Sequence, residues 1–153
     1  MTRTLAAALR PGILAGLAGG VLLDAYLLAV GALSHRLTPE QLYTYVASGL
    51  IGKGAYAWPG MLWLGLVVHL LVSIGWGVAY AYVAVSTPQV AANPVISGTV
   101  YGLVVFVMMQ IVQALAGIWR PPSFGEAFTN VVAHVVFFGL PVAFVVARRL
   151  RPA

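Results

Sequence analysis

Long apolar stretches, separated by short segments of proline, glycine and polar residues, dominate the pattern along the chain. A helix needs about 20 apolar residues to cross the hydrocarbon core of a bilayer. Four stretches reach this length, and they cover residues 12–33, 61–85, 95–117 and 124–147. The pattern therefore predicts an all-α, polytopic membrane protein, a single transmembrane domain over 1–153 that folds as a four-transmembrane-helix bundle.

Helix-breaking residues stand where the predicted spans should begin and end. These separators are Pro11, Pro59, the segment STPQVAANP at 86–94 and the segment RPP at 120–122. The fourth span opens with SFGE, in which the Ser123 side chain can cap the helix and the Glu126 side chain can bond back to the cap. This capping box predicts where the fourth helix begins.

A longer segment between the first two spans predicts a short additional helix over about 39–52. Thr38, Pro39 and Gln41 supply a cap, a proline in the first turn and a second capping box. The segment is too short to span, so we expect the helix to lie at the membrane interface. Aromatic side chains would then sit at headgroup level, namely Tyr43, Tyr45, Tyr56 and Trp58.

Composition agrees with a membrane location. The chain is 61% hydrophobic and 7% charged, whereas soluble domains have about 25% charged residues. The net charge is +5, but the basic residues lie between apolar runs and do not cluster on a polar face, which argues against a nucleic-acid partner. The absence of cysteine excludes disulfides, thiolate metal ligands and cysteine nucleophiles. The predicted partner is the lipid bilayer.

The distribution of lysine and arginine predicts the orientation. The side that holds both termini has Arg3, Arg10, Arg148, Arg149 and Arg151. The opposite side has Arg36, Lys53 and Arg120. Basic residues favour the cytoplasmic side, so we expect both termini in the cytoplasm.

Polar residues within the predicted spans form the candidate site. From the helix rise of about 1.5 Å per residue, they fall in one slab of the membrane at or just outside the midplane. The members of this predicted cluster are Asp24, His69, Gln110, Asn130 and His134. Intramembrane polar groups usually face the bundle interior, where they serve either as a functional site or as bonds between helices. Asp24 is the most informative member, because a buried carboxylate must be protonated or paired.

Small residues at four-residue spacing indicate close helix packing. One stripe, formed by Gly12, Gly16 and Gly20, leads directly to Asp24. The pattern also suggests an internal repeat of two parallel hairpins, a type of symmetry known in transporters. Its proposed register pairs His69 with His134, Gly75 with Gly139, Gly16 with Gly98 and Gly20 with Gly102.

Several motifs in this order resemble a family of small, uncharacterised four-helix bacterial inner-membrane proteins. They are the first glycine stripe with Asp24, then ASGLIGKGAY, LGLVVHLLVSIGWGVAYAY, SGTVYGLVVFVMMQ and HVVFFGLPVAFVVARR. The resemblance covers nearly the whole chain. It implies four spans and a bacterial inner-membrane location, and it carries no established activity.

Three functions compete at this point. The first is a non-catalytic accessory or scaffold component of a membrane complex, with other membrane-protein subunits or a second copy as partners. The second is a redox protein that binds haem b through His69 and His134 on two helices. The third is a proton or small-solute conduit that uses Asp24 and the two histidines. No residue is assigned a catalytic role, and no spacing motif supports a metal site.

Overall fold

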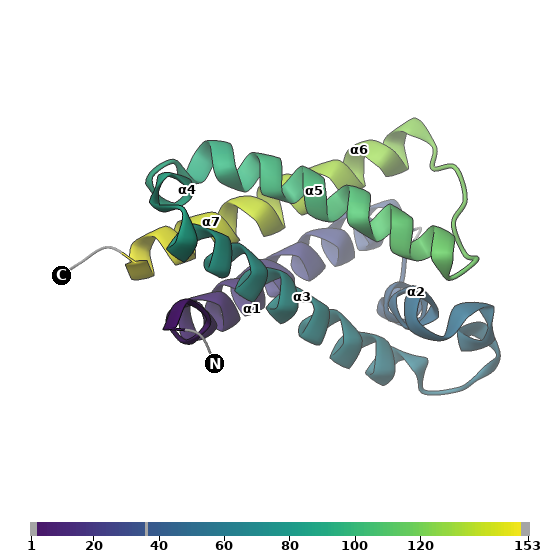
Figure 1. The fold of residues 1–153 in the computed structure, drawn as a ribbon. Coiled ribbons are helices and arrows are strands. Elements are labelled where there is room, and N and C mark those ends of the chain that lie inside the picture. The colour runs from purple at the N-terminus through teal and green to yellow at the C-terminus, as the bar shows by residue number, and fades with distance from the viewer. Residues whose placement is uncertain (1–2, 36, 151–153) are drawn as a thin grey trace.

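The computed structural model describes residues 3–35 and 37–150, and over these residues helices joined by short loops make up the fold (Figure 1). Four of the helices in this part of the chain are long and apolar enough to cross a membrane. These helices cover Arg3–Ser34, Met61–Ser86, Pro94–Leu115 and Phe124–Leu150. The prediction of an all-α, four-helix bundle is confirmed, and by length and composition these are the helices of a multi-pass membrane protein.

The elements follow one another without a strand in the described ranges. In chain order they are α1 (Arg3–Ser34), α2 (Pro39–Ile51), the 3₁₀ helix η1 (Gly52–Ala57), α3 (Met61–Ser86), α4 (Pro88–Ala92), α5 (Pro94–Leu115), α6 (Phe124–Val132), the π-helix η2 (Ala133–Gly139) and α7 (Leu140–Leu150). The fourth span is therefore one rod made of α6, η2 and α7, with a π segment near its middle.

The helix starts follow the capping signals in two places. Thr38 accepts a hydrogen bond from the backbone of Gln41, whose side chain accepts one from the Thr38 backbone, so both halves of the box are present. Ser123 and Glu126 form the same reciprocal pair at the start of α6. These boxes satisfy backbone N–H groups that the first helical turn leaves free.

The expectation that Pro11 precedes the first helix is wrong. Helix α1 begins at Arg3 and continues through Pro11. Proline removes one backbone hydrogen bond within a helix, but packing on both sides of it holds the segment helical. Ala8 is fully buried, and Gly12 packs against the backbone of α3. Of the residues in the charge count above, Arg36 and Arg151 lie outside the described residues.

Close backbone contact joins α1 to α3. A Cβ atom added at Gly16 would lie 2.3 Å from the Ser73 carbonyl oxygen, and one added at Gly12 would lie 2.5 Å from Cα of Val78. Any larger residue at these positions would force the helices apart. The glycine stripe therefore sets the distance between α1 and α3 and brings Asp24 against α3.

The same packing occurs a second time between α5 and the fourth span. Gly98 faces the Gly139 carbonyl and Leu140 as Gly12 faces the Gly77 carbonyl and Val78. Gly102 faces the carbonyl of His134 and Cα of Val135, as Gly16 faces those atoms of Ser73 and Ile74. The contacts therefore pair Gly12 with Gly98, Gly16 with Gly102, Gly77 with Gly139 and Ser73 with His134.

A repeat of two hairpins is thus present in the packing, but its register differs from the one that the sequence suggested. The first stripe has three glycines and the second has two, so two alignments one helical turn apart are equally good in sequence. The π segment adds a further shift, because Gly139 follows His134 by five positions whereas Gly77 follows Ser73 by four. In the structural register, Asp24 corresponds to Gln110 and His69 to Asn130.

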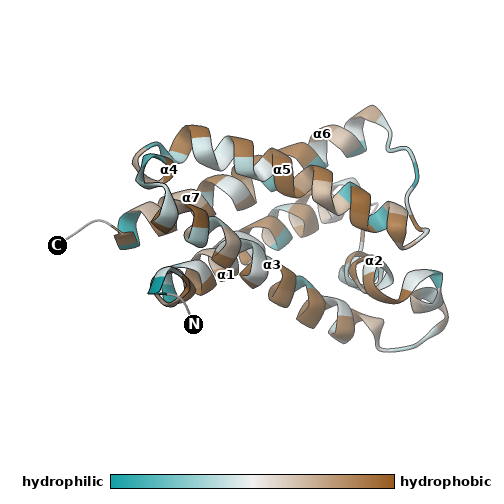
Figure 2. Cartoon of the chain, viewed as in Figure 1, coloured by the Kyte–Doolittle hydropathy of each residue, from teal (hydrophilic) through white to brown (hydrophobic). Residues whose placement is uncertain are grey.

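The arrangement of the helices leaves space on one side of the bundle. The start of α1, the end of α7 and α4 lie at one end of the bundle (Figure 1), where Tyr80 hydrogen-bonds Ser97 (2.7 Å) and Tyr101 donates to the carbonyl of Trp76. From this closed end α3 and α5 diverge, and α2 lies between them at the opposite end (Figure 1). Outward-facing stretches of α3 and α5 are strongly hydrophobic, and polar residues gather towards the two ends of the bundle (Figure 2).

Candidate functional site: an intramembrane cavity with a carboxylate–histidine pair

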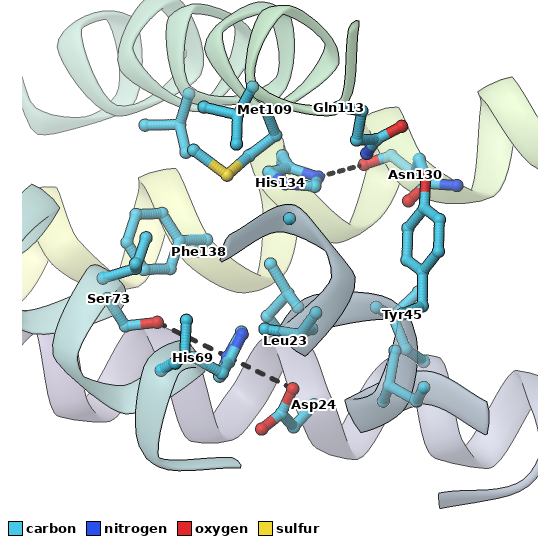
Figure 3. Close-up of a pocket in the computed structure, with 18 of the residues that line it drawn as sticks. Leu23, Asp24, Tyr45, His69, Ser73, Met109, Gln113, Asn130, His134 and Phe138 are labelled. Carbon is cyan, nitrogen blue, oxygen red and sulfur yellow. Dashed lines mark hydrogen bonds and ion pairs between the residues drawn. The ribbon is translucent and has the colours of Figure 1, made fainter. Parts of the chain in front are cut away.

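A cavity of about 300 Å³ lies in the space where α3 and α5 diverge. Most of its wall consists of apolar side chains from α1, α2, α3 and α5. Several polar side chains also reach it, among them those of Asp24, His69, Ser73, Gln113, Asn130 and His134. Figure 3 shows Asp24, His69 and Ser73 on one side, with Gln113, Asn130 and His134 on the other. A mainly apolar cavity with a few convergent polar groups is the usual form of a small-molecule site.

Asp24 is the centre of a three-helix junction. Its Oδ1 atom lies 3.2 Å from Nε2 of His69 on α3. Its Oδ2 atom accepts a hydrogen bond of 2.9 Å from the Tyr43 hydroxyl on α2. The side chain is buried, and each of its two carboxylate oxygens has a partner inside the protein. The aspartate in the first span is therefore paired rather than isolated.

The glycine stripe explains why His69 reaches Asp24. At Gly20, an added Cβ would lie 2.7 Å from Oγ of Ser73 and 3.6 Å from Nε2 of His69. The Gly20 carbonyl oxygen itself lies 3.4 Å from the same imidazole nitrogen. With glycine at this position, the imidazole can approach the α1 backbone and contact the carboxylate one turn further along.

The neighbours of His69 fix the position of one of its protons. Nε2 faces the Asp24 carboxylate, the Gly20 carbonyl and the Ser73 hydroxyl, which is 3.4 Å away. Because a carbonyl oxygen only accepts hydrogen bonds, Nε2 must be the protonated, donating nitrogen. The pair is therefore arranged as carboxylate and N–H donor.

Tyr43 supplies the second donor from outside the spanning helices. Burial, together with its hydrogen bond to Asp24, raises the pKa of the Tyr43 hydroxyl to about 12. The group therefore stays protonated and keeps donating at any ordinary pH. We expected Tyr43 at headgroup level, but its side chain is only 8% exposed, whereas Tyr56 and Trp58 lie largely exposed. Tyr43 shares the buried face of α2 with Leu42 and Ala47, and its helical spacing from these apolar residues is the sequence signal that could have identified it.

His134, on the other side of the cavity, carries its proton on the other ring nitrogen. Its Nδ1 lies 2.8 Å from the backbone carbonyl oxygen of Asn130, so Nδ1 carries the proton and donates it. In the neutral ring Nε2 is then the acceptor. The ring also makes an edge contact with Phe106, at 5.7 Å between centroids. His134 lies in the π segment, a feature that is common at functional sites.

Four of the five residues in the predicted polar cluster line the cavity, and Gln110 does not. Its side-chain oxygen accepts a hydrogen bond of 3.1 Å from the Trp119 indole. Gln113, one turn further along α5, lines the cavity in its place. Asn130 uses its amide nitrogen to donate to the Glu126 carbonyl, so it acts within its own helix. Gln110 and Asn130 thus make these side-chain hydrogen bonds away from the Asp24–His69 pair.

The structure bears on metal binding and on the haem hypothesis. Within the described residues, no group of three His, Cys, Asp or Glu side chains is close enough to hold a metal ion. Haem ligation by His69 and His134 stays a prediction. Both histidines line one cavity, but Nε2 of His69 faces Asp24 at 3.2 Å. Ligation through that nitrogen requires the Asp24 contact to break.

Comparison with known proteins gives no independent assignment. No protein-family model matches the chain, and no curated protein or solved structure shows significant similarity to it. The suggested kinship with small bacterial membrane proteins stays a prediction. Any functional argument therefore depends on the cavity and the side chains that line it.

Proposed function

We propose that this chain is a small multi-pass protein of the bacterial inner membrane, with cytoplasmic termini, that binds a small, largely apolar solute within the bilayer. The observation that carries this proposal is the Asp24–His69 pair at the wall of a mainly apolar cavity. Of the three functions considered from the sequence, the small-solute conduit is the one that requires solute binding. The paired ionisable groups then serve as the polar end of the site.

The shape of the cavity supports entry from the lipid phase. Leu50, Val72 and Val112 line the cavity and are also exposed on the outer surface of the bundle, at 64%, 40% and 38%. They come from α2, α3 and α5, the three helices that border the diverging side. A solute with an apolar body can therefore enter sideways from the bilayer.

The closed end of the bundle supports access from one side. Tyr80, Tyr101 and Trp76 pack together where α3 and α5 approach each other, with 4.9 Å between the two tyrosine rings. The cavity extends from this point towards α2. A site at mid-depth that opens away from one packed end is what the binding state of a carrier requires.

The accessory or scaffold hypothesis makes a different prediction. A scaffold needs Asp24 and His69 only as bonds between helices, so it gives the cavity no occupant. The haem hypothesis is tested separately by oxidised and dithionite-reduced visible spectra of the purified protein. Ligation by the two histidines requires a Soret band that both His69→Ala and His134→Ala remove.

Thermal unfolding in phosphatidylcholine nanodiscs with added 1-octanol tests solute binding. A ligand that binds the folded state raises the unfolding temperature. Met109 lines the cavity and can be replaced by tryptophan to fill it. Its neighbour Met108 is exposed on the outer surface, and Met108→Trp is the matched control.

We expect 1-octanol to stabilise the wild type and Met108→Trp more than Met109→Trp. Octanol dissolved in the bilayer acts on all three proteins alike, so the difference between the tryptophan variants reports the cavity. Equal shifts in all three proteins, or no shift in the wild type, would contradict the proposal.

A further inference from the structure

Three titratable side chains around the cavity, those of Tyr43, His69 and His134, have their hydrogen-bond donors committed to protein atoms. Nε2–H of His69 and the Tyr43 hydroxyl both point to Asp24. Nδ1–H of His134 points to the Asn130 carbonyl. What this set still offers a ligand is acceptor capacity: the Asp24 carboxylate, Nε2 of neutral His134 and, when His69 is neutral, Nδ1 of that ring.

Apart from the two histidines, the charged side chains that line the cavity in the described part of the chain are acidic. Asp24 is the only acidic residue that lines the cavity in the described part of the chain, and no lysine or arginine there joins it. The remaining titratable neighbours are Tyr43 and Tyr45 on α2, His69 on α3 and His134 on η2. The lining residues of α5 are apolar except for Gln113. Only an imidazole can therefore balance the carboxylate from within the protein.

We propose that the cavity selects a lipophilic cation, such as an alkylammonium group on an apolar body, and that its binding beside Asp24 releases one proton from the Asp24–His69 pair. This inference rests on the proposed solute binding and names the class of solute. The ammonium group donates to the carboxylate, and the apolar body fills the space between α3 and α5.

Electrostatic balance dictates the release of the proton. An unbalanced charge inside a membrane protein is costly. We therefore take the empty site to be neutral overall: the ionised Asp24 carboxylate and the neutral His69 imidazole together hold one additional proton. A cation that enters adds one positive charge. The site stays neutral when His69 gives that proton up, so one ammonium is bound and one proton leaves. Bonds to carbon do not change.

The same balance rejects anions and ranks neutral solutes below cations. A carboxylate ligand would bring a second negative charge beside Asp24 without a cation to meet it. A neutral alcohol leaves the pair intact and gains only its apolar contacts and one hydrogen bond. Octylammonium, 1-octanol and octanoate therefore form a matched series with one apolar body and three head groups.

The test uses wild-type protein in phosphatidylcholine nanodiscs with these three probes. We expect octylammonium to bind more tightly than 1-octanol, and octanoate not to bind. A pH indicator in weak buffer should record one proton released per octylammonium bound. Octylammonium affinity should rise about tenfold per pH unit where the pair holds its proton, and 1-octanol affinity should stay constant.

Asp24→Asn provides the matching variant, with Glu40→Gln as the control because Glu40 is an exposed carboxylate on α2 outside the cavity. Asp24→Asn should lose proton release and the preference for octylammonium while 1-octanol still stabilises it. Glu40→Gln should behave as the wild type. The measurements on unmodified protein decide the matter even where Asp24→Asn fails to fold.

The outcomes separate the two proposals. If 1-octanol binds in the cavity and octylammonium binds no better, the cation inference is wrong and the solute-binding function stands. If octylammonium binds tightly without releasing a proton, the coupling is wrong. If no probe distinguishes Met109→Trp from Met108→Trp, both the solute-binding function and the inference fail.

Discussion

His69 and His134 face one cavity with their protons held on opposite ring nitrogens. In His69 the donor is Nε2, which lies 3.2 Å from Asp24. In His134 the donor is Nδ1, which lies 2.8 Å from the Asn130 carbonyl. The first histidine is bound to an ionisable partner on another helix, and the second to the backbone of its own helix. The two rings are therefore unlike in chemistry, although both occupy the bundle interior.

Nitrogen NMR can test this assignment. We expect neutral His134 to be the Nδ1–H tautomer, because a backbone carbonyl accepts only from a protonated nitrogen. Spectra of protein with ¹⁵N-labelled histidine should show one ring whose Nδ1 is protonated and whose Nε2 is not, and His134→Gln should remove that signal. A neutral His134 signal with the proton on Nε2 would contradict the assignment.

The Asp24–His69 pair should contribute to stability in a way that depends on a donor at position 69. His69→Leu leaves a buried carboxylate with only Tyr43 beside it, and we expect a loss of about 3 kcal/mol. His69→Gln keeps an N–H donor and should cost about 1 kcal/mol. Reversible unfolding in mixed micelles measures both. Equal losses for the two variants would show that the contact contributes little.

The glycine contact between α1 and α3 predicts a contrast between two alanine substitutions. In Gly16→Ala the new Cβ would lie 2.3 Å from the Ser73 carbonyl oxygen, so the helices must separate, at a cost of about 2 kcal/mol. Gly75 lies on α3 with open space around it. Gly75→Ala should stabilise the helix by up to about 1 kcal/mol. Unfolding of the two variants in one detergent checks the sign of each change.

Tyr43 predicts a loss of stability in alkaline solution. Its pKa is raised to about 12 in the folded protein, from an ordinary value of 10.0. Between these values the unfolded chain loses the hydroxyl proton and the folded chain keeps it, so ionisation favours unfolding. The stabilisation is complete below pH 10 and declines as the pH rises towards 12.

Comparison with Tyr43→Phe isolates this effect from other alkaline titrations. Below pH 10 the wild type should be more stable than Tyr43→Phe by about 1.5 kcal/mol, for the lost hydrogen bond to the carboxylate. That difference should shrink between pH 10 and 12 in denaturant unfolding series. A constant difference across this range would show that the hydroxyl is not held by Asp24.

The sequence predicts the helices well because length and apolar content determine them. The four long helices and both capping boxes depend on local chemistry, which a reader of the chain can follow residue by residue. Pro11 is the exception, since tertiary packing around Ala8 and Gly12 overrides the local tendency of proline to end a helix.

The site is predicted only in part because its partners depend on rotation and register. Asp24, His69 and His134 could be named from polarity alone. Which of them meet depends on the rotation of each helix, and the π segment changes that rotation without a sequence signal. Sequence reasoning places Tyr43 at headgroup level with Tyr56 and Trp58, because it cannot tell that α2 turns Tyr43 towards Asp24 while those two aromatic residues stay exposed.

The π segment also changes the helical rotation of the fourth span, so that residues before it and after it face directions that a regular α-helix would not combine. Each residue added to or removed from a helix turns everything beyond it by about 100°. The additional residue between His134 and Gly139 allows Gly139 to meet Gly98 while His134 keeps its face on the cavity. Deleting Val136 would take up that turn, and either the glycine contact or the histidine would rotate towards lipid. One residue of helix length thus determines whether the second imidazole belongs to the site.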